Sequence, residues 1–138
     1  MPITPKSSRA VILVKALPQP SRRYGETVCC AGVTVDRQWK RLYPVRFRHL
    51  QGEKSFARWD WVSFNYKLPT TDLRAESCHV FEDSIFVDGK LPERERGRLL
   101  GPLIVGSAKH AMELNQSLAL IRPRNTRFIA KQKSKSWD

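Results

Sequence analysis

The sequence predicts an α+β domain that is mainly antiparallel β-sheet, with two helices inserted near residues 92–115. Two observations lead to this fold class. Short runs of β-branched and aromatic residues alternate with turn signals over most of the chain, and helix start and stop signals gather in one late stretch. Short strands that are joined by turns and followed by late helices are typical of a small, partly open barrel, so we expect an OB-like or PUA-like barrel.

The first strands of this barrel can be placed from residue patterns. Residues 11–16 are β-branched and apolar on both faces except at Lys15, which predicts a central strand. Residues 28–46 predict a β-hairpin with its turn at residues 36–38. Gly32 interrupts the first hairpin strand and predicts a bulge or a close approach of another backbone. Further strands are expected at residues 58–67, 79–87, 117–122 and 126–130, with turns or loops at 17–27, 68–78 and 88–89.

Sequence signals also bound the two helices. Pro92 at the first turn and Glu93 at the positive end of the helix dipole predict a helix that ends near Leu100, before a Gly-Pro pair. Ser107 is a good N-cap for a second short helix that ends near residue 115. The residues of this second helix that we expect to be buried are Ala108, Ala111, Met112 and Leu114.

A chain of 138 residues is long enough for one domain with its own core. We expect a flexible lead-in at residues 1–9, a single basic domain at residues 10–130 and a disordered basic tail at residues 131–138. The sequence has neither a signal-peptide pattern nor an apolar run near the roughly 18 residues of a spanning helix, so no membrane partner is expected. Its three cysteines, an odd number, predict reduced thiols in a cytoplasmic protein.

Charge is the most unusual property of the composition. Lys and Arg total 25 against 13 Asp and Glu, which gives a formal net charge of +12. Residues 1–66 carry 12 basic and 4 acidic groups and residues 101–138 carry 7 and 2, whereas residues 67–100 are balanced at 6 and 7. Because a polyanion relieves the mutual repulsion of so many cations, nucleic acid, either DNA or RNA, is the expected partner.

The segment WKRLYPVRFRHL at residues 39–50 concentrates this charge. As a strand it would turn its aromatic residues toward the core, with Arg41 on the same face, and Lys40, Arg46 and Arg48 outward. Pro44 cannot donate a ladder hydrogen bond, which predicts an edge strand. We therefore expect a basic edge on which a partner docks, although cations on an edge also discourage aggregation. The residues expected to face the core are Trp39, Tyr43, Val45 and Phe47.

The predicted strand at residues 58–67 places Trp59 and Trp61 on the face opposite its ordinary core residues. Two exposed rings at this spacing would stack on successive bases, as in sites for single strands or RNA, whereas the alternative is that a helix covers them. The nucleic-acid-binding residues predicted from the whole chain are Arg22, Arg23, Tyr24, Lys40, Arg41, Arg46, Arg48, Trp59, Trp61, Arg122, Arg124 and Arg127.

No reaction follows from the sequence, so we expect a binding module without cofactor or metal rather than an enzyme. A small nuclease acting on DNA or RNA is one alternative, and a basic subunit of a protein or ribonucleoprotein complex is another. The candidate catalytic residues of the nuclease are Asp72, Glu76 and His79. A zinc site built from Cys29, Cys30, Cys78 and His79 is not expected, because adjacent ligands crowd a tetrahedron.

Five segments together carry a resemblance: YGETVCCAGV, WKRLYPVRF, ARWDWVSF, TDLRAES and SLALIRPRN. In this combination the chain resembles a group of small uncharacterised prokaryotic basic proteins. The resemblance implies that about residues 10–125 form one domain, and it brings no activity and no functional residues with it.

Overall fold

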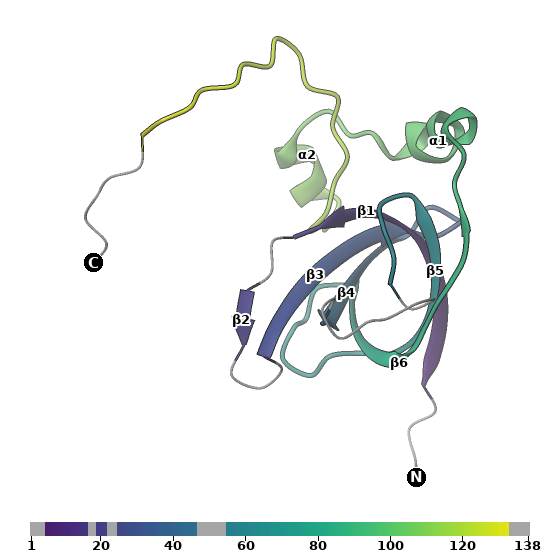
Figure 1. Cartoon of the computed structure of the whole chain (residues 1–138). Helices are drawn as coiled ribbons and strands as arrows, with labels where there is room; N and C mark the ends of the chain where they lie inside the picture. The colour runs from purple at the N-terminus through teal and green to yellow at the C-terminus, as the bar shows by residue number, and fades with distance from the viewer. Residues whose placement is uncertain (1–4, 17–18, 22–24, 47–54, 133–138) are drawn as a thin grey trace.

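The protein is a small closed β-barrel with two short helices on one side (Figure 1). The computed structural model describes residues 5–16, 19–21, 25–46 and 55–132. The order around the barrel is β1-β5-β6-β4-β3, and pairing of β1 with β3 closes it. The barrel strands are β1 (Lys6–Lys15), β3 (Gly25–Val33), β4 (Trp39–Val45), β5 (Asp60–Lys67) and β6 (Ser77–Lys90), and β2 (Gln19–Ser21) pairs with the outer end of β3.

The expected small α+β barrel is therefore confirmed, with two differences. The barrel is closed rather than partly open, and one strand pair, β4 with β6, runs parallel while the other four are antiparallel. The parallel pair arises because β5 and β6 form a hairpin whose second strand returns alongside β4. This register places Arg41 beside Ser77 and Tyr43 beside His79.

The central strand predicted at residues 11–16 is part of β1, which begins earlier, at Lys6. Lys6 to Arg9, expected to belong to a flexible lead-in, instead pair with Tyr66 to Ser63 of β5. The second half of β1 pairs with β3, and the close approach predicted at Gly32 is confirmed there. A Cβ at position 32 would lie 2.3 Å from the carbonyl oxygen of Val11, so a glycine is needed where the barrel closes.

The predicted hairpin is confirmed, but the prediction that its second strand lies at an edge was wrong. β4 pairs with β3 on one side and with β6 on the other. Pro44 is tolerated because the ladder to β6 ends at Tyr43 and because the β3 ladder has a bulge there, with three steps on β4 opposite two on β3. The bulge brings both Leu42 and Val45 into the barrel, whereas Tyr43, expected in the core, is 40% exposed.

Two apolar clusters hold the fold together. The first fills the barrel with residues of all five strands, including Ile12, Leu42 and Phe64. The second lies on the outer surface of β1, β3, β5 and the start of β4, where α1 (Glu93–Leu100) and the segment after it cover Val11, Trp39 and Trp61. The expected core face of β5 is confirmed, because its residues Val62, Phe64 and Tyr66 are buried in the barrel.

Both predicted helices are present. α1 begins at Glu93 after Pro92 and is followed by a short 3-10 helix, η3 (Gly101–Leu103). α2 (Ala108–Glu113) is capped by Ser107, whose hydroxyl accepts a hydrogen bond of 3.1 Å from the backbone N–H of His110. Of the four residues expected to be buried in this helix, only Ala111 is buried. A helix of six residues is too short to turn several side chains toward the rest of the protein. Ala108, Met112 and Leu114 are exposed.

Three expectations about the later segments were wrong. The Asp-Gly pair at residues 88–89 is not a turn, since β6 continues to Lys90 and Asp88 is an extra residue that bulges between Val87 and Gly89. Residues 117–122 form a single bridge, between Leu120 and Ile104, and residues 126–130 form no strand. A closed barrel offers them no free edge, so their β-propensity finds no partner. Within the described residues, no helix is long and apolar enough to cross a membrane.

Candidate functional site

A hollow lies where β3, β4 and the start of β6 meet the loop at residues 68–76. It is a pocket of about 600 Å³. Its walls combine cations, hydroxyl groups, one phenol ring and one imidazole. The lining residues are Cys29, Arg41, Tyr43, Lys67, Pro69, Thr70, Thr71, Asp72, Arg74, Ser77, Cys78 and His79.

Strand register explains why these residues meet. Leu42 points into the barrel, so its neighbours Arg41 and Tyr43 point outward onto the pocket. The parallel pairing places His79 beside Tyr43, and the antiparallel pairing on the other side of β6 places Lys67 beside the same histidine. Three strands thus present a histidine, a ring and a cation in one row.

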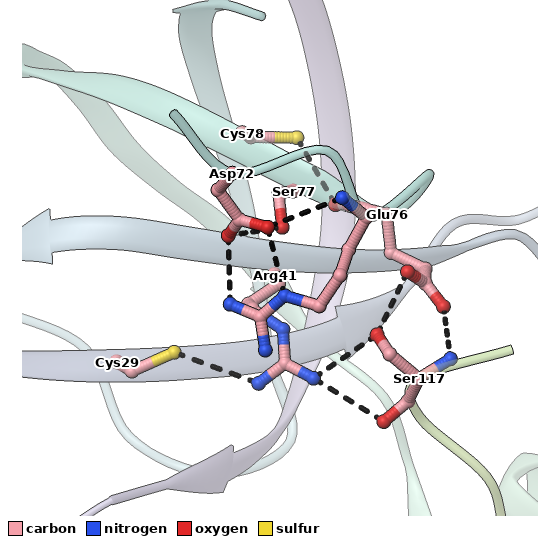
Figure 2. A network of polar contacts seen from close by, with 8 residues as sticks. Cys29, Arg41, Asp72, Glu76, Ser77, Cys78 and Ser117 are labelled. Carbon is pink, nitrogen blue, oxygen red and sulfur yellow. Dashed lines mark hydrogen bonds and ion pairs between the residues drawn. The ribbon is translucent and has the colours of Figure 1, made fainter. Parts of the chain in front are cut away.

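Arg41 connects the pocket with the C-terminal part of the chain (Figure 2). Its guanidinium donates to the Cys29 sulfur over 3.9 Å and to the carbonyl and hydroxyl oxygens of Ser117 over 3.3 and 3.2 Å. Its Nε is buried and has no hydrogen-bond partner in the part of the chain that the structure describes. A guanidinium that is held in place on the wall of a pocket is suited to attract an oxygen-rich ligand through its positive charge.

Glu76 holds Ser117, the residue to which the Arg41 guanidinium donates. It is buried, and its two carboxylate oxygens accept from the backbone N–H of Ser117 at 2.6 Å and from the Ser117 hydroxyl at 2.8 Å (Figure 2). Burial opposes ionisation of this carboxyl, but the hydrogen bonds from Ser117 and the positive charge of Arg41 together hold its pKa below the ordinary value. Glu76 is therefore an ionised structural anchor at neutral pH.

Asp72 is also committed to neighbours. It accepts two hydrogen bonds from the Arg74 guanidinium, of 2.9 and 2.7 Å, and one of 2.7 Å from the Ser77 hydroxyl. The Arg74 contact and then the Ser77 hydroxyl hold the pKa of Asp72 well below its usual range. This ion pair within the loop balances the charge of Arg74. Lys67, by contrast, is exposed and has no acidic partner among the described residues.

The structure separates the cations predicted to bind nucleic acid. Arg41 lines the pocket, but Arg46 is paired with Glu82 through a contact of 2.7 Å. Lys40 does not point outward, because its ammonium lies 5.5 Å from the Tyr66 ring centroid at an end of the barrel. Arg122, Arg124 and Arg127 are exposed on the segment after α2. Arg22, Arg23, Tyr24 and Arg48 lie outside the described residues.

Of the two alternatives for Trp59 and Trp61, the one with both rings exposed was wrong. Trp61 is only 9% exposed, packed in the outer cluster beneath the Arg9 guanidinium, which lies 4.2 Å from its ring centroid. Trp59 is half-buried between Arg58 and Arg96, at 4.9 and 4.0 Å from its centroid. Large aromatic rings are more stable when they are covered than when they are exposed to water, and here α1 and the three arginines cover them. Tyr43, which lines the pocket, is 40% exposed.

The candidate catalytic residues do not form a recognisable catalytic group. Asp72 and His79 line the pocket, but the Asp72 carboxylate is bonded to Arg74 and the Glu76 carboxylate is bonded to Ser117. Among the described residues, no three His, Cys, Asp or Glu side chains gather as a metal-ligand group, so the four zinc-type residues are not brought together in that way. Because both carboxyl groups are ionised and already accept hydrogen bonds, neither can readily act as a general acid.

Several pocket residues had no signal of their own in the sequence. Lys67, Thr70 and Thr71 belong to a strand end and a loop that read as ordinary solvated structure. Ser117 was expected on a strand, yet it joins the site from 41 residues beyond Glu76. The pairing of β6 with β4 and β5 and the contact of Glu76 with Ser117 bring these segments together, and alternation within one strand cannot reveal such contacts.

Comparisons with known proteins give one match. A family model with the description "Domain of unknown function (DUF8758)" matches residues 6–102, which include all the barrel strands and α1. No curated protein and no solved structure matches the chain.

Proposed function

We propose that this chain, which belongs to the DUF8758 family, is a nucleic-acid-binding module that holds a single strand against the pocket on β3, β4 and β6. One observation carries the proposal: Arg41, Lys67 and Arg74 surround a pocket of about 600 Å³ that is also lined by Tyr43, which is 40% exposed. Cations bind phosphate oxygens, and an exposed ring stacks on a base face. The pocket thus offers both kinds of contact that a single strand needs.

The place of the pocket in the fold supports the same function. We infer that the barrel is OB-like, since it has five strands, a helix-covered side and one parallel strand pair, β4 with β6. In OB-like barrels, oligonucleotides bind on the second and third strands and on the loops that join strands 1–2 and 4–5. Counted along the chain over the five barrel strands, those elements are β3, β4, the connection that contains β2, and residues 68–76. Two of the strands and one of the loops line the pocket. A PUA-like barrel is the other fold that we considered.

Charge favours a polyanion over a neutral ligand. The chain carries a net charge of +12, and Lys67 stands on the pocket without an acidic partner in the described part of the chain. Each such cation that neutralises a phosphate releases counterions that were condensed on the nucleic acid. Binding should therefore weaken steeply with salt, whereas binding of an uncharged ligand would not.

Fluorescence anisotropy of a labelled single strand, measured as RNA and as DNA over a range of salt concentrations, tests the proposal. We expect log K to fall linearly with log salt, and Lys67→Gln to reduce the slope by about 0.7, the value for one phosphate of a single strand. Lys90→Gln removes an equal charge at the opposite end of β6 and should leave the slope unchanged. Tyr43→Leu should weaken binding while Tyr43→Phe, which keeps the ring, should not.

Three outcomes would count against the proposal. If the wild-type protein binds neither strand at low salt, the function is excluded. If it binds with a slope that Lys67→Gln and Lys90→Gln reduce equally, net charge rather than the pocket is responsible. If it binds no nucleic acid but purifies in a stable complex with an acidic protein, the alternative of a basic subunit takes its place.

A further inference from the structure

The segment after α2 has a chemistry of its own. Residues 118–132, which we name the C-terminal arm, contain four cations and no acidic residue. Its one aromatic residue, Phe128, is 94% exposed, and the neighbouring Ile129 is 73% exposed. The cations are Arg122, Arg124, Arg127 and Lys131. A short run that interleaves cations with an open ring is a typical single-strand-binding composition.

The outer part of the arm is not used by the fold. Residues 121–132 are exposed throughout, and they form no hydrogen bond or ion pair with any other residue that the structure describes. Figure 1 shows this stretch, in yellow-green and yellow, leading away from the barrel. Its positive charges are therefore not neutralised by the described part of the protein. An exposed phenylalanine that packs on nothing is costly in water and gains from a partner.

The base of the arm, in contrast, is fixed at the pocket. Ser117 is held by Glu76 and by Arg41, and Arg41 lines the pocket. Leu118 and Leu120 pack against the outer apolar cluster, and the carbonyl oxygen of Leu120 accepts a hydrogen bond of 2.9 Å from the backbone N–H of Val105. Arg122 follows Ser117 by five residues, so it lies within about 17 Å of the pocket rim even if the chain is fully extended.

We propose that the C-terminal arm is a second nucleic-acid contact, onto which a strand held in the pocket continues. This inference rests on the proposed function of the pocket. The arginines of the arm neutralise phosphates beyond the pocket, and Phe128 stacks on an unpaired base. Because the arm is tethered, its contacts form at a high effective concentration once the pocket is occupied. Long strands should consequently bind more tightly than short ones, and the arm should become ordered on binding.

The experiment compares two labelled single strands, one of about 4 nucleotides and one of about 16, the limits of site size for a small barrel. The triple variant R122Q/R124Q/R127Q should bind the short strand as wild type does. On the long strand its salt slope should be smaller by about 2, from three lost phosphate contacts at about 0.7 each. Phe128→Ala should weaken binding of the long strand about fivefold or more without affecting the short one.

A matched variant separates contact from net charge. R94Q/R98Q/K109Q removes the same three charges from exposed positions on α1 and α2, and it should leave both strands bound as in wild type. If this control reduces the long-strand slope as much as the arm variant does, the arm is not a contact. If the arm variant binds the long strand with the wild-type slope, the inference is overturned while the pocket function stands. If wild type binds neither strand, both are overturned.

Discussion

The carboxylate of Glu76 accepts two hydrogen bonds from Ser117, one of 2.6 Å from the backbone N–H and one of 2.8 Å from the hydroxyl. These two residues are 41 positions apart, and they join the loop before β6 to the segment that follows α2. The same Ser117 hydroxyl accepts from Arg41. One carboxylate thereby fixes both the C-terminal segment and, through Ser117, the orientation of a pocket cation.

Glu76→Gln should destabilise the protein at neutral pH and flatten its response to acid. The pKa of Glu76 is lower in the folded state than the unfolded value of about 4.3, so its stabilisation is present above that pH and is lost as pH falls toward the folded pKa. Loss of hydrogen bonds to a charged group should cost about 2 kcal/mol near pH 7. Urea unfolding at neutral pH and below about pH 4 measures both effects.

Glu113→Gln is the matched control for this substitution. Glu113 lies on the exposed surface of α2, where its contact with His110 is 3.7 Å long and both side chains are more than half exposed. We expect this variant to stay within about 0.5 kcal/mol of wild type. Equal stability of Glu76→Gln and Glu113→Gln at neutral pH would contradict the role of Glu76 as an anchor.

Arg37 links the β3–β4 hairpin to the end of α1, and its backbone and side chain can be tested separately. Its guanidinium donates to the carbonyl oxygens of Leu99 and Arg98 over 3.1 and 3.2 Å, where the negative end of the helix favours a cation. Its φ of 66° lies in the left-handed region. Arg37→Ala should therefore lose about 1 kcal/mol of unfolding free energy.

Arg37→Gly removes the same side chain but relieves the left-handed backbone. We expect it to be more stable than Arg37→Ala by up to about 1 kcal/mol, as measured by urea unfolding. Arg94→Ala, an exposed position of α1, should change stability by less than about 0.5 kcal/mol. A glycine variant less stable than the alanine variant would show that the hairpin does not hold position 37 in the conformation described.

Local signals predicted those parts of the fold that depend on neighbouring residues. The hairpin turn, the start of α1 after Pro92, the Ser107 cap and the Gly32 contact were all found where they were expected. Predictions that depended on which segments lie beside a strand were wrong. Pro44 was assigned to an edge, yet a bulge and the end of the β6 ladder accommodate it inside the sheet. Residues 126–130 have strand-like composition, but the closed barrel leaves them nothing to pair with.

The candidate site was less predictable than the fold for a physical reason. Net charge pointed to an anionic partner but could not say which cations are already neutralised. Arg46 is paired with Glu82 of another segment and Arg74 with Asp72 of its own loop, while Lys67 has no acidic partner among the described residues. Likewise the spacing of Trp59 and Trp61 fits a stacking face, and only the position of α1 decides that they are covered. These facts depend on tertiary contacts, which no single segment contains.

Gly32→Ala and Gly97→Ala should change stability in opposite directions. At position 32 the added methyl group would lie 2.3 Å from the Val11 carbonyl oxygen, so the closing strands β1 and β3 must move apart. We expect a loss of about 2 kcal/mol or more. At position 97, in the exposed surface of α1, nothing lies within 4 Å, and alanine should stabilise the helix by about 0.5–1 kcal/mol. Thermal and urea unfolding of both variants provide the measurement, and a tolerated Gly32→Ala would refute the close approach.

The three cysteines should react with alkylating reagents at very different rates. Cys30 and Cys78 are buried, and burial raises the pKa of their thiols to about 12 and about 11, so little thiolate forms near pH 8. Cys29 is partly exposed on the pocket, beside Arg41. Mass spectrometry after brief treatment with iodoacetamide should show one adduct on the native protein and three on the unfolded chain.

Cys29→Ser identifies the reactive thiol, because the native variant should then remain unmodified. The same reaction also tests the pocket, since a strand bound against Arg41 and Tyr43 would cover the Cys29 sulfur and slow its alkylation. The buried thiols provide an internal reference, because a ligand that only stabilised the fold would slow their modification and leave Cys29 reactive. Rapid modification of Cys30 or Cys78 in the native protein would show that the barrel opens at the strands that carry them, and protection of Cys29 by a single strand that is lost in high salt would indicate phosphate binding at this wall.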